Sequence, residues 1–113
     1  MKRGEVWTAA GGQAYAGKPR PVVILQDDRF DATDSITVCP LTSDPTPSLL
    51  FRVPIEPNSD NGLRKRSYVM ADKVASIPRA RIRALVGALG DEDVVRLNRA
   101  VLMFLGLVGS SSR

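Results

Sequence analysis

The apolar run PVVIL at residues 21–25 constrains the fold of this chain most strongly. Five consecutive apolar residues, three of them β-branched, are typical of a strand that is buried on both faces. Arg20 stands directly before this run, between Pro19 and Pro21, so a permanent cation marks the entrance to a buried strand. Arg20 is therefore either a solvated charge at a strand edge or a fixed cation that binds an anion.

The first two-thirds of the chain shows the patterns of further short strands. These lie at residues 3–9, 35–43, 49–57 and 67–77, the last of them forming one or two strands. Polar segments rich in Gly, Pro, Asn and Asp separate them, at residues 10–17, 27–35, 44–48 and 58–63, and a short turn or helical piece is expected at residues 78–81. Pro40 and Pro54 predict bulged or edge positions, and the Asn61-Gly62 pair predicts a turn.

The last third changes to a helical period. Asp91 is expected to cap a helix, with Glu92 and Asp93 at the positive end of its dipole. An apolar stripe follows, made of Leu97, Val101, Phe104 or Leu105, and Val108. We expect a mainly β (α+β) fold, a small bent barrel or sheet with one C-terminal helix packed on it, whose excess apolar surface is available for a dimer. The 113 residues allow a single domain over residues 1–108, followed by a disordered tail at 109–113.

Composition removes several classes of chemistry. The chain has no histidine and a single cysteine, Cys39, which argues against a disulfide, a Cys-rich zinc site and a Cys-His nucleophile pair. We expect no metal and no cofactor, and interpret the carboxylates Asp27, Asp28 and Asp31 as a solvated turn. No signal peptide or membrane span is evident, so a cytoplasmic protein is expected. The net charge of +4 is compatible with a polyanionic partner but is equally explained by solubility.

Basic and hydroxyl side chains remain as candidates for chemistry. Arginine forks bind phosphate oxygens bidentately and keep their charge at any working pH. Besides Arg20, Lys18 follows the glycine-bearing loop. Two further basic runs consist of Arg64, Lys65 and Arg66, and of Arg79, Arg81 and Arg83. Thr42 and Ser43 end the strand predicted at residues 35–43, and they converge with Arg20 if the two strands are neighbours. For each basic cluster, a solvated surface remains the alternative.

The order of these segments along the chain resembles that of the MazF/PemK family of toxin endoribonucleases from toxin–antitoxin modules. The resemblance is nearly full length and runs through RGEVW, a glycine-bearing loop, KPRPVVIL, ITVCPLTS, the NGL turn, MADKVASI and the helix VVRLNRAVLMFLGL. It implies an SH3-like barrel of the CcdB/PemK type, a homodimer, and metal-independent cleavage of single-stranded RNA at short sequence motifs. It also implies a cognate MazE-like antitoxin, whose acidic C-terminal segment covers the RNA groove.

By position, the resemblance assigns the family's catalytic arginine to Arg20 and its catalytic threonine to Thr42. The loop that gates the RNA groove corresponds to residues 10–18, which lack the glutamate found in some members and offer Gln13 or Tyr15 instead. The candidate RNA-binding residues are Gln13, Tyr15, Lys18, Ser43, Arg64, Lys65, Arg66, Lys73, Arg79 and Arg81. The RNA is mRNA, rRNA or tRNA, a choice that the sequence leaves open.

Two alternatives stay open at this point. A CcdB-like toxin on the same fold would bind DNA gyrase without catalysis, whereas the Arg-Pro and Thr-Ser positions match the nuclease branch. An RNA-binding regulator without activity is the second. For the nuclease, the RNA's own 2′-hydroxyl is the expected nucleophile, with Arg20 on the phosphate oxygens and Thr42 on the phosphate and 2′-hydroxyl.

Overall fold

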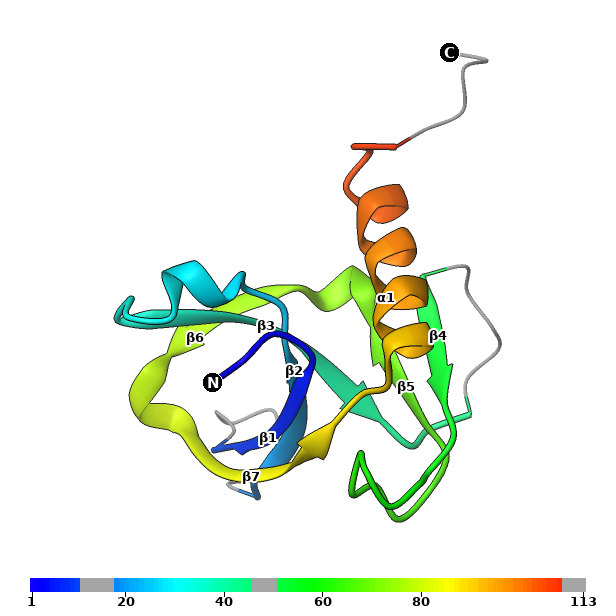
Figure 1. Cartoon of the computed structure of the whole chain (residues 1–113), viewed down its shortest axis with the longest axis horizontal. Coiled ribbons are helices and arrows are strands. Elements are labelled where there is room, and N and C mark those ends of the chain that lie inside the picture. Colours follow the sequence, from blue (N-terminus) through cyan, green and yellow to red (C-terminus); the bar gives the residue numbers. More distant parts are fainter. Residues whose placement is uncertain (11–17, 46–50, 109–113) are drawn as a thin grey trace.

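Strand β3 (Ser35–Thr42) is shared by two antiparallel sheets in a computed structural model that describes residues 1–10, 18–45 and 51–108. In one sheet β3 pairs with β2 (Arg20–Ile24) and β6 (Ala75–Pro78), and β1 (Glu5–Ala9) joins β2 to β7 (Ile82–Ala88). In the other, the end of β3 pairs with β5 (Ser67–Met70), which pairs with β4 (Arg52–Ile55). Figure 1 shows the first sheet curling into a ring, with β4, β5 and the helix α1 (Asp91–Phe104) beside it.

The predicted mainly β fold with one C-terminal helix packed on the sheet is confirmed. Residues 22–25 are buried, as the PVVIL run predicts for a central strand. The segment predicted at residues 67–77 forms two strands, β5 and β6, separated by the short 3₁₀ helix η3 (Ala71–Lys73). The helical piece expected at residues 78–81 is η4 (Arg79–Arg81), and the turn at 27–35 contains η2 (Asp28–Phe30).

Both prolines occupy positions that tolerate a missing N–H group. Pro54 lies in β4, which is the terminal strand of its sheet, as predicted. Pro40 pairs with Val22 on one side of β3. On the other side it falls between the β6 partners, which end at Val38, and the β5 partners, which begin at Leu41. Pro40 therefore lies where β3 passes from one neighbouring strand to another.

Alternation along β3 supplies two hydrophobic clusters, one on each face. Cys39 and Leu41 belong to the larger cluster, which α1 closes with Leu97 and Ala100. Ile36 and Val38 belong to the smaller cluster inside the ring, together with Val22, Ile24 and Ala9. Because successive side chains of a strand point to opposite faces, residues 20 and 42 belong to the face of the smaller cluster.

The ends of α1 differ from the sequence expectation. Gly90, in an extended conformation, is the N-cap, and Asp91 is the first helical residue rather than the cap. Asp91, Glu92 and Asp93 do occupy the first turn, where the helix dipole favours carboxylates. At the other end Gly106 has a φ of 74°, and the N–H of Leu107 donates to Leu102 O at 2.9 Å. This Schellman-type end stops the helix before Val108, which the predicted stripe had included.

A serine at position 90 is expected to stabilise the protein by about 1 kcal/mol. Its hydroxyl would accept a hydrogen bond from a first-turn N–H that Gly90 leaves without a side-chain cap. Loss of glycine's freedom in the unfolded chain adds to the effect, and a Cβ at position 90 meets nothing within 4 Å. Thermal unfolding should show Tm rising by roughly 4–8 °C. Gly90→Ala lacks the hydroxyl, so an equal gain in that variant would argue against capping.

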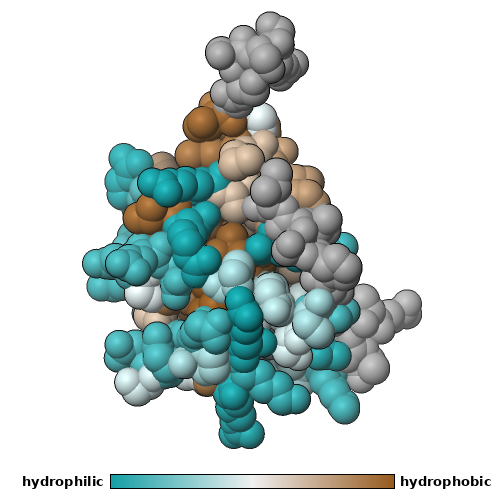
Figure 2. Space-filling view, turned by 90° about the vertical axis from the view of Figure 1, so that its right-hand side faces the viewer, coloured by the Kyte–Doolittle hydropathy of each residue, from teal (hydrophilic) through white to brown (hydrophobic). Residues whose placement is uncertain are grey.

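The exposed end of α1 is apolar. Met103, Phe104, Leu105, Leu107 and Val108 are each 45–69% exposed, whereas Leu97, the first member of the predicted stripe, is 1% exposed. Figure 2 shows one face of the molecule, with apolar residues gathered at its top and hydrophilic residues over its lower part. Surface of this kind is what the expected dimer interface requires. Among the residues described, no helix is long and apolar enough to cross a membrane.

The connection from β4 to β5 is built around Asn61, which is fully buried. Its side-chain oxygen accepts from the N–H groups of Asn58 and Leu63, at 3.1 and 3.0 Å, and its amide donates to Glu56 O at 2.9 Å. Asp60 O accepts from Ala88 N at 2.9 Å, so this turn lies against the outer edge of β7. The predicted Asn-Gly turn is confirmed, with Gly62 at a φ of 68°.

Strand β7 has no counterpart among the sequence predictions. Its residues, IRALVGA, contain two alanines and a glycine, and all of them are exposed or half-buried. The segment therefore shows neither the continuous apolar run nor the strict alternation that predicts a strand. Pairing with β1 and the covering turn at residues 58–62 hold it in the sheet instead.

Candidate functional site

Arg20 is the first residue of β2 and Thr42 is the last residue of β3, so both lie at the same end of the β2–β3 hairpin. The two strands pair antiparallel, with Val22 opposite Pro40, and the same register continued by two residues sets Arg20 against Thr42. Side chains of directly opposite residues lie on the same face, with Cβ atoms about 4.5–5.5 Å apart. The strand pairing therefore agrees with the joint site expected from the sequence.

The backbone around Arg20 is held on its other side as well. Arg20 is the first residue of β2 and pairs with Ala9 of β1. Its side chain is exposed, as are those of Lys18 and Pro19. Strand β2 is paired with β1 at Arg20 and continues into a buried run. A guanidinium on such a strand keeps its position better than one on a loop, and an anion site needs a fixed position.

Thr42 is half-buried, and its hydroxyl oxygen already accepts a hydrogen bond from the N–H of Asp44 at 3.1 Å. This contact uses one lone pair and leaves the hydroxyl proton available for donation to a phosphate oxygen. Ser43 follows it and is exposed. A permanent cation and a hydroxyl at the same end of one hairpin are groups that suit binding of a phosphodiester.

Tyr68, which the sequence analysis did not single out, is the next side chain in the same row. It pairs directly with Thr42 across β3 and β5, and with Pro54 across β5 and β4. Its neighbour Val69 is fully buried on the opposite face. The alternation of SYVM within the predicted strand at 67–77 could have indicated that Tyr68 faces away from the main core.

The residues predicted to bind RNA lie in different parts of the structure. Arg64, Lys65 and Arg66 are exposed in the β4–β5 connection, and Arg66 Nε lies 2.9 Å from Glu56 Oε2. Lys73 and Arg81 are also exposed, and Arg81 O accepts from Ala10 N at 2.7 Å, which places Arg81 beside the start of the 10–18 loop. Gln13 and Tyr15 lie outside the described residues.

Arg79 has a structural role that competes with its predicted contact to RNA. Its backbone N–H donates to Asp34 O at 2.8 Å, and its Nε donates to Thr33 O at 3.0 Å. One terminal nitrogen, Nη2, is buried and has no hydrogen-bond partner among the described residues. The side chain therefore braces the β2–β3 connection against η4 at the end of the hairpin remote from Arg20 and Thr42.

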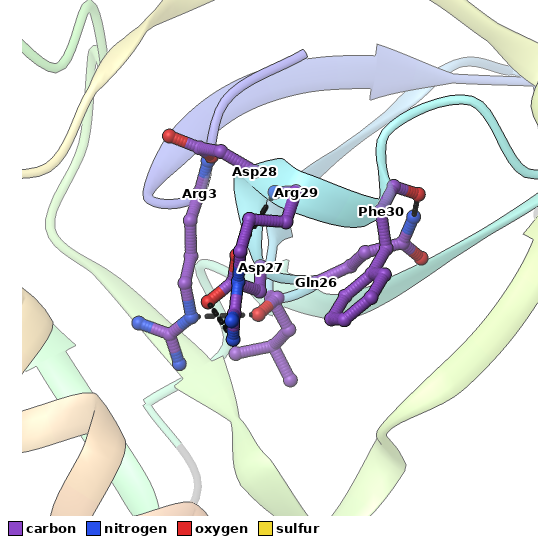
Figure 3. Close-up of polar contacts among 7 residues, drawn as sticks. Arg3, Gln26, Asp27, Asp28, Arg29 and Phe30 are labelled. Atoms are coloured by element: carbon purple, nitrogen blue, oxygen red, sulfur yellow. Dashed lines mark hydrogen bonds and ion pairs between the residues drawn. The ribbon is translucent and has the colours of Figure 1, made fainter.

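The acidic turn after β2 is used within the protein. Figure 3 shows Asp27 next to Arg29 and Asp28 at the backbone of Arg3. Asp27 caps η2 and lies 3.1 Å from Arg29 Nε, and hydrogen bonds from Arg29 lower the pKa of this carboxyl. Asp28 accepts from Arg3 N at 2.6 Å. Among the described residues, no group of three His, Cys, Asp or Glu side chains is placed to hold a metal ion.

Cys39 belongs to the core. The side chain is 0% exposed in the centre of β3, and burial raises the pKa of its thiol to about 12. A thiol that stays protonated at neutral pH is a poor nucleophile, in agreement with the argument from the sequence against a Cys-His nucleophile pair.

Comparison with known proteins gives one consistent result. Residues 2–105 match the family model described as PemK-like, MazF-like toxin of type II toxin–antitoxin system. A protein named probable endoribonuclease MazF, from Mycolicibacterium smegmatis, is 51% identical over 109 residues that cover 96% of this chain and 100% of that protein.

Solved structures agree on the fold. An endoribonuclease in complex with its cognate antitoxin, from a mycobacterial species, has a TM-score of 0.81 at 23% identity and covers 96% of this chain and 97% of that one. A MazE–MazF structure from Deinococcus radiodurans has a TM-score of 0.75 at 19% identity, covering 94% of this chain and 95% of that one. With a family model that spans nearly the whole sequence, the chain belongs to the PemK-like, MazF-like toxins of type II toxin–antitoxin systems.

Proposed function

We propose that this chain is a sequence-specific endoribonuclease toxin that cleaves single-stranded RNA without a metal ion. The observation that supports the proposal is the antiparallel pairing of β2 and β3, whose register, continued by two residues beyond Val22 and Pro40, brings Arg20 toward Thr42. Family membership and the 51% identical probable endoribonuclease support the same reaction class. They do not favour the gyrase-binding alternative.

The reaction uses the RNA's 2′-hydroxyl as nucleophile. Its oxygen attacks the adjacent phosphorus, the bond to the departing 5′-oxygen breaks, and the products carry a 2′,3′-cyclic phosphate and a 5′-hydroxyl. Extra negative charge develops on the non-bridging oxygens in the transition state, and Arg20 stabilises it through two parallel N–H donors. Thr42 donates to the phosphate and keeps the 2′-hydroxyl in line. The 2′-hydroxyl loses its proton as the 5′-oxygen gains one.

Partners follow from the family. We infer that the chain acts as a homodimer, for which the exposed apolar end of α1 supplies surface. A cognate MazE-like antitoxin with an acidic C-terminal segment neutralises it, as the antitoxin complexes among its structural neighbours suggest. Exposed cations near Arg20 and in the β4–β5 connection favour such a segment and the RNA alike.

The test is cleavage of defined single-stranded RNA by purified protein in excess EDTA. We expect discrete fragments whose 5′ products end in a 2′,3′-cyclic phosphate, identified by mass spectrometry, and loss of cleavage when cognate antitoxin is added. Full activity only after a divalent ion is restored would overturn metal independence. Intact RNA under all conditions would support the gyrase-binding or regulator alternatives instead.

A further inference from the structure

Tyr68 lies on β5, the strand that pairs with β3 at Thr42. Thr42 of β3 and Tyr68 of β5 are directly opposite in register. The β2–β3 pairing ends at Val22 and Pro40, and its register continued by two residues brings Arg20 to the same row. Neighbouring strands are about 4.8 Å apart, so the aromatic ring starts one strand spacing from Thr42. The ring is half-buried on a paired strand, so its position is fixed while part of its surface stays accessible.

A planar cation already covers this ring. The guanidinium carbon of Arg66 lies 5.7 Å from the centroid of Tyr68, and Arg66 Nε is 2.9 Å from Glu56 Oε2. The Arg66 and Glu56 side chains are 56% and 70% exposed, so both contacts are weak and easily exchanged. A ring that stacks an arginine in this way has a π-face directed to the surface, which is also what a nucleobase stacks on.

Single-stranded RNA is recognised through unstacked bases that lie on aromatic side chains. We propose that Tyr68 is the stacking platform for the base next to the scissile phosphate, an inference that rests on the proposed nuclease function. The base replaces the guanidinium of Arg66 on the ring, and Arg66 leaves Glu56 for an RNA phosphate. Stacking one base fixes the strand against Arg20 and Thr42, so Tyr68 positions the substrate and takes no part in proton transfer.

The chain contains a matched control at the opposite end of the same hairpin. Phe30 is 55% exposed, the guanidinium carbon of Arg29 lies 5.3 Å from its ring centroid, and Arg29 is paired with Asp27 at 3.1 Å (Figure 3). An aromatic ring, a stacked arginine and a carboxylate thus recur in a place remote from Thr42. General effects of removing an exposed ring appear equally at both positions, whereas base stacking appears only at Tyr68.

The experiment compares Tyr68→Val, Tyr68→Phe and Phe30→Val with the wild-type protein. The probe is an RNA containing a mapped cleavage site, made resistant by 2′-deoxy substitution there, with 2-aminopurine as the neighbouring base. We expect Y68V to weaken RNA binding about tenfold to a hundredfold, and Y68F and F30V to stay within about twofold of wild type. The cleavage rate at saturating RNA should stay close to the wild-type rate in F30V, because Phe30 lies outside the proposed site. Wild-type protein and Y68F should quench 2-aminopurine fluorescence, and Y68V should not.

Three results would overturn the inference: wild-type affinity and quenching in folded Y68V, an equal loss in F30V, or a loss confined to antitoxin binding. If Y68V does not fold, quenching by the wild-type protein and by Y68F decides the question, because an unstacked base is not quenched. Failure of the wild-type protein to cleave any RNA is a different outcome, because it removes the proposed function itself.

Discussion

Replacing Arg20 with alanine is expected to lower the rate of RNA cleavage by at least about 100-fold to 1000-fold. Arg20 is a permanent cation at the same end of the β2–β3 hairpin as Thr42, so its loss removes the group that we assign to the charge developing on the phosphate. The chain has no histidine that could take over. The measurement is single-turnover cleavage of one defined RNA at saturating protein, which separates the chemical step from binding.

Two variants control this result. Lys18→Ala removes an exposed cation two residues away and should change the rate by no more than a few-fold, because a solvated lysine contributes mainly to the salt dependence of binding. Arg20→Lys keeps the charge but loses the planar fork, so an intermediate rate is expected. If R20A has a native circular dichroism spectrum and cleaves within threefold of wild type, the assignment of Arg20 is wrong.

Gly87→Ala is expected to destabilise the fold by about 3 kcal/mol or more. A Cβ at position 87 would lie 2.4 Å from Asp60 O and 2.5 Å from Asn61 C, both backbone atoms of the turn that covers β7. That turn cannot withdraw cheaply, because the buried Asn61 side chain fixes it with three hydrogen bonds. Thermal unfolding should show Tm falling by roughly 12 °C or more.

Gly90→Ala is the matched comparison for this prediction. Position 90 lies three residues further along, and a Cβ there meets nothing within 4 Å, so its stability should change by only about 0.5 kcal/mol. Equal Tm values for G87A and wild type would mean that the turn at residues 58–62 moves freely from β7. The two glycines therefore separate close backbone contact from a general effect of adding a methyl group.

The hydrophobic pattern of the sequence predicted those strands and helices whose apolar residues recur with the period of the element itself. PVVIL has the composition of a strand buried on both faces, and the stripe at Leu97 and Val101 has the period of a packed helix. β7 was missed because its pairing with β1 and the covering turn hold it in the sheet, and a sequence window contains neither. Gly90 replaced Asp91 as the cap because backbone conformation decides the cap, and a cluster of three acids marks only the first turn.

The candidate site was predictable to a similar degree. The prolines around Arg20 and the end of the PLTS segment pointed to two positions, and the expected neighbouring of their strands is what the antiparallel pairing of β2 and β3 shows. Tyr68 was missed because its relevance depends on register: a shift of one residue in the pairing of β3 and β5 would turn its ring to the other face. Arg79 looked like its neighbours in the sequence, and only its contacts with Thr33 and Asp34 distinguish it.

Pairing of the first strand with the last has a consequence for the synthesis of this protein. β1 pairs with β7, with Glu5 opposite Ala88, and the larger core cluster also needs Leu97 and Ala100 from α1. Chains emerge from the ribosome at about 5–20 residues per second, N-terminus first. Arg20, Thr42 and Tyr68 are thus all translated before the segments that close the ring and cover the core. The growing chain carries the residues of the site without the support that holds them in place, so we expect toxicity to begin only when translation has finished.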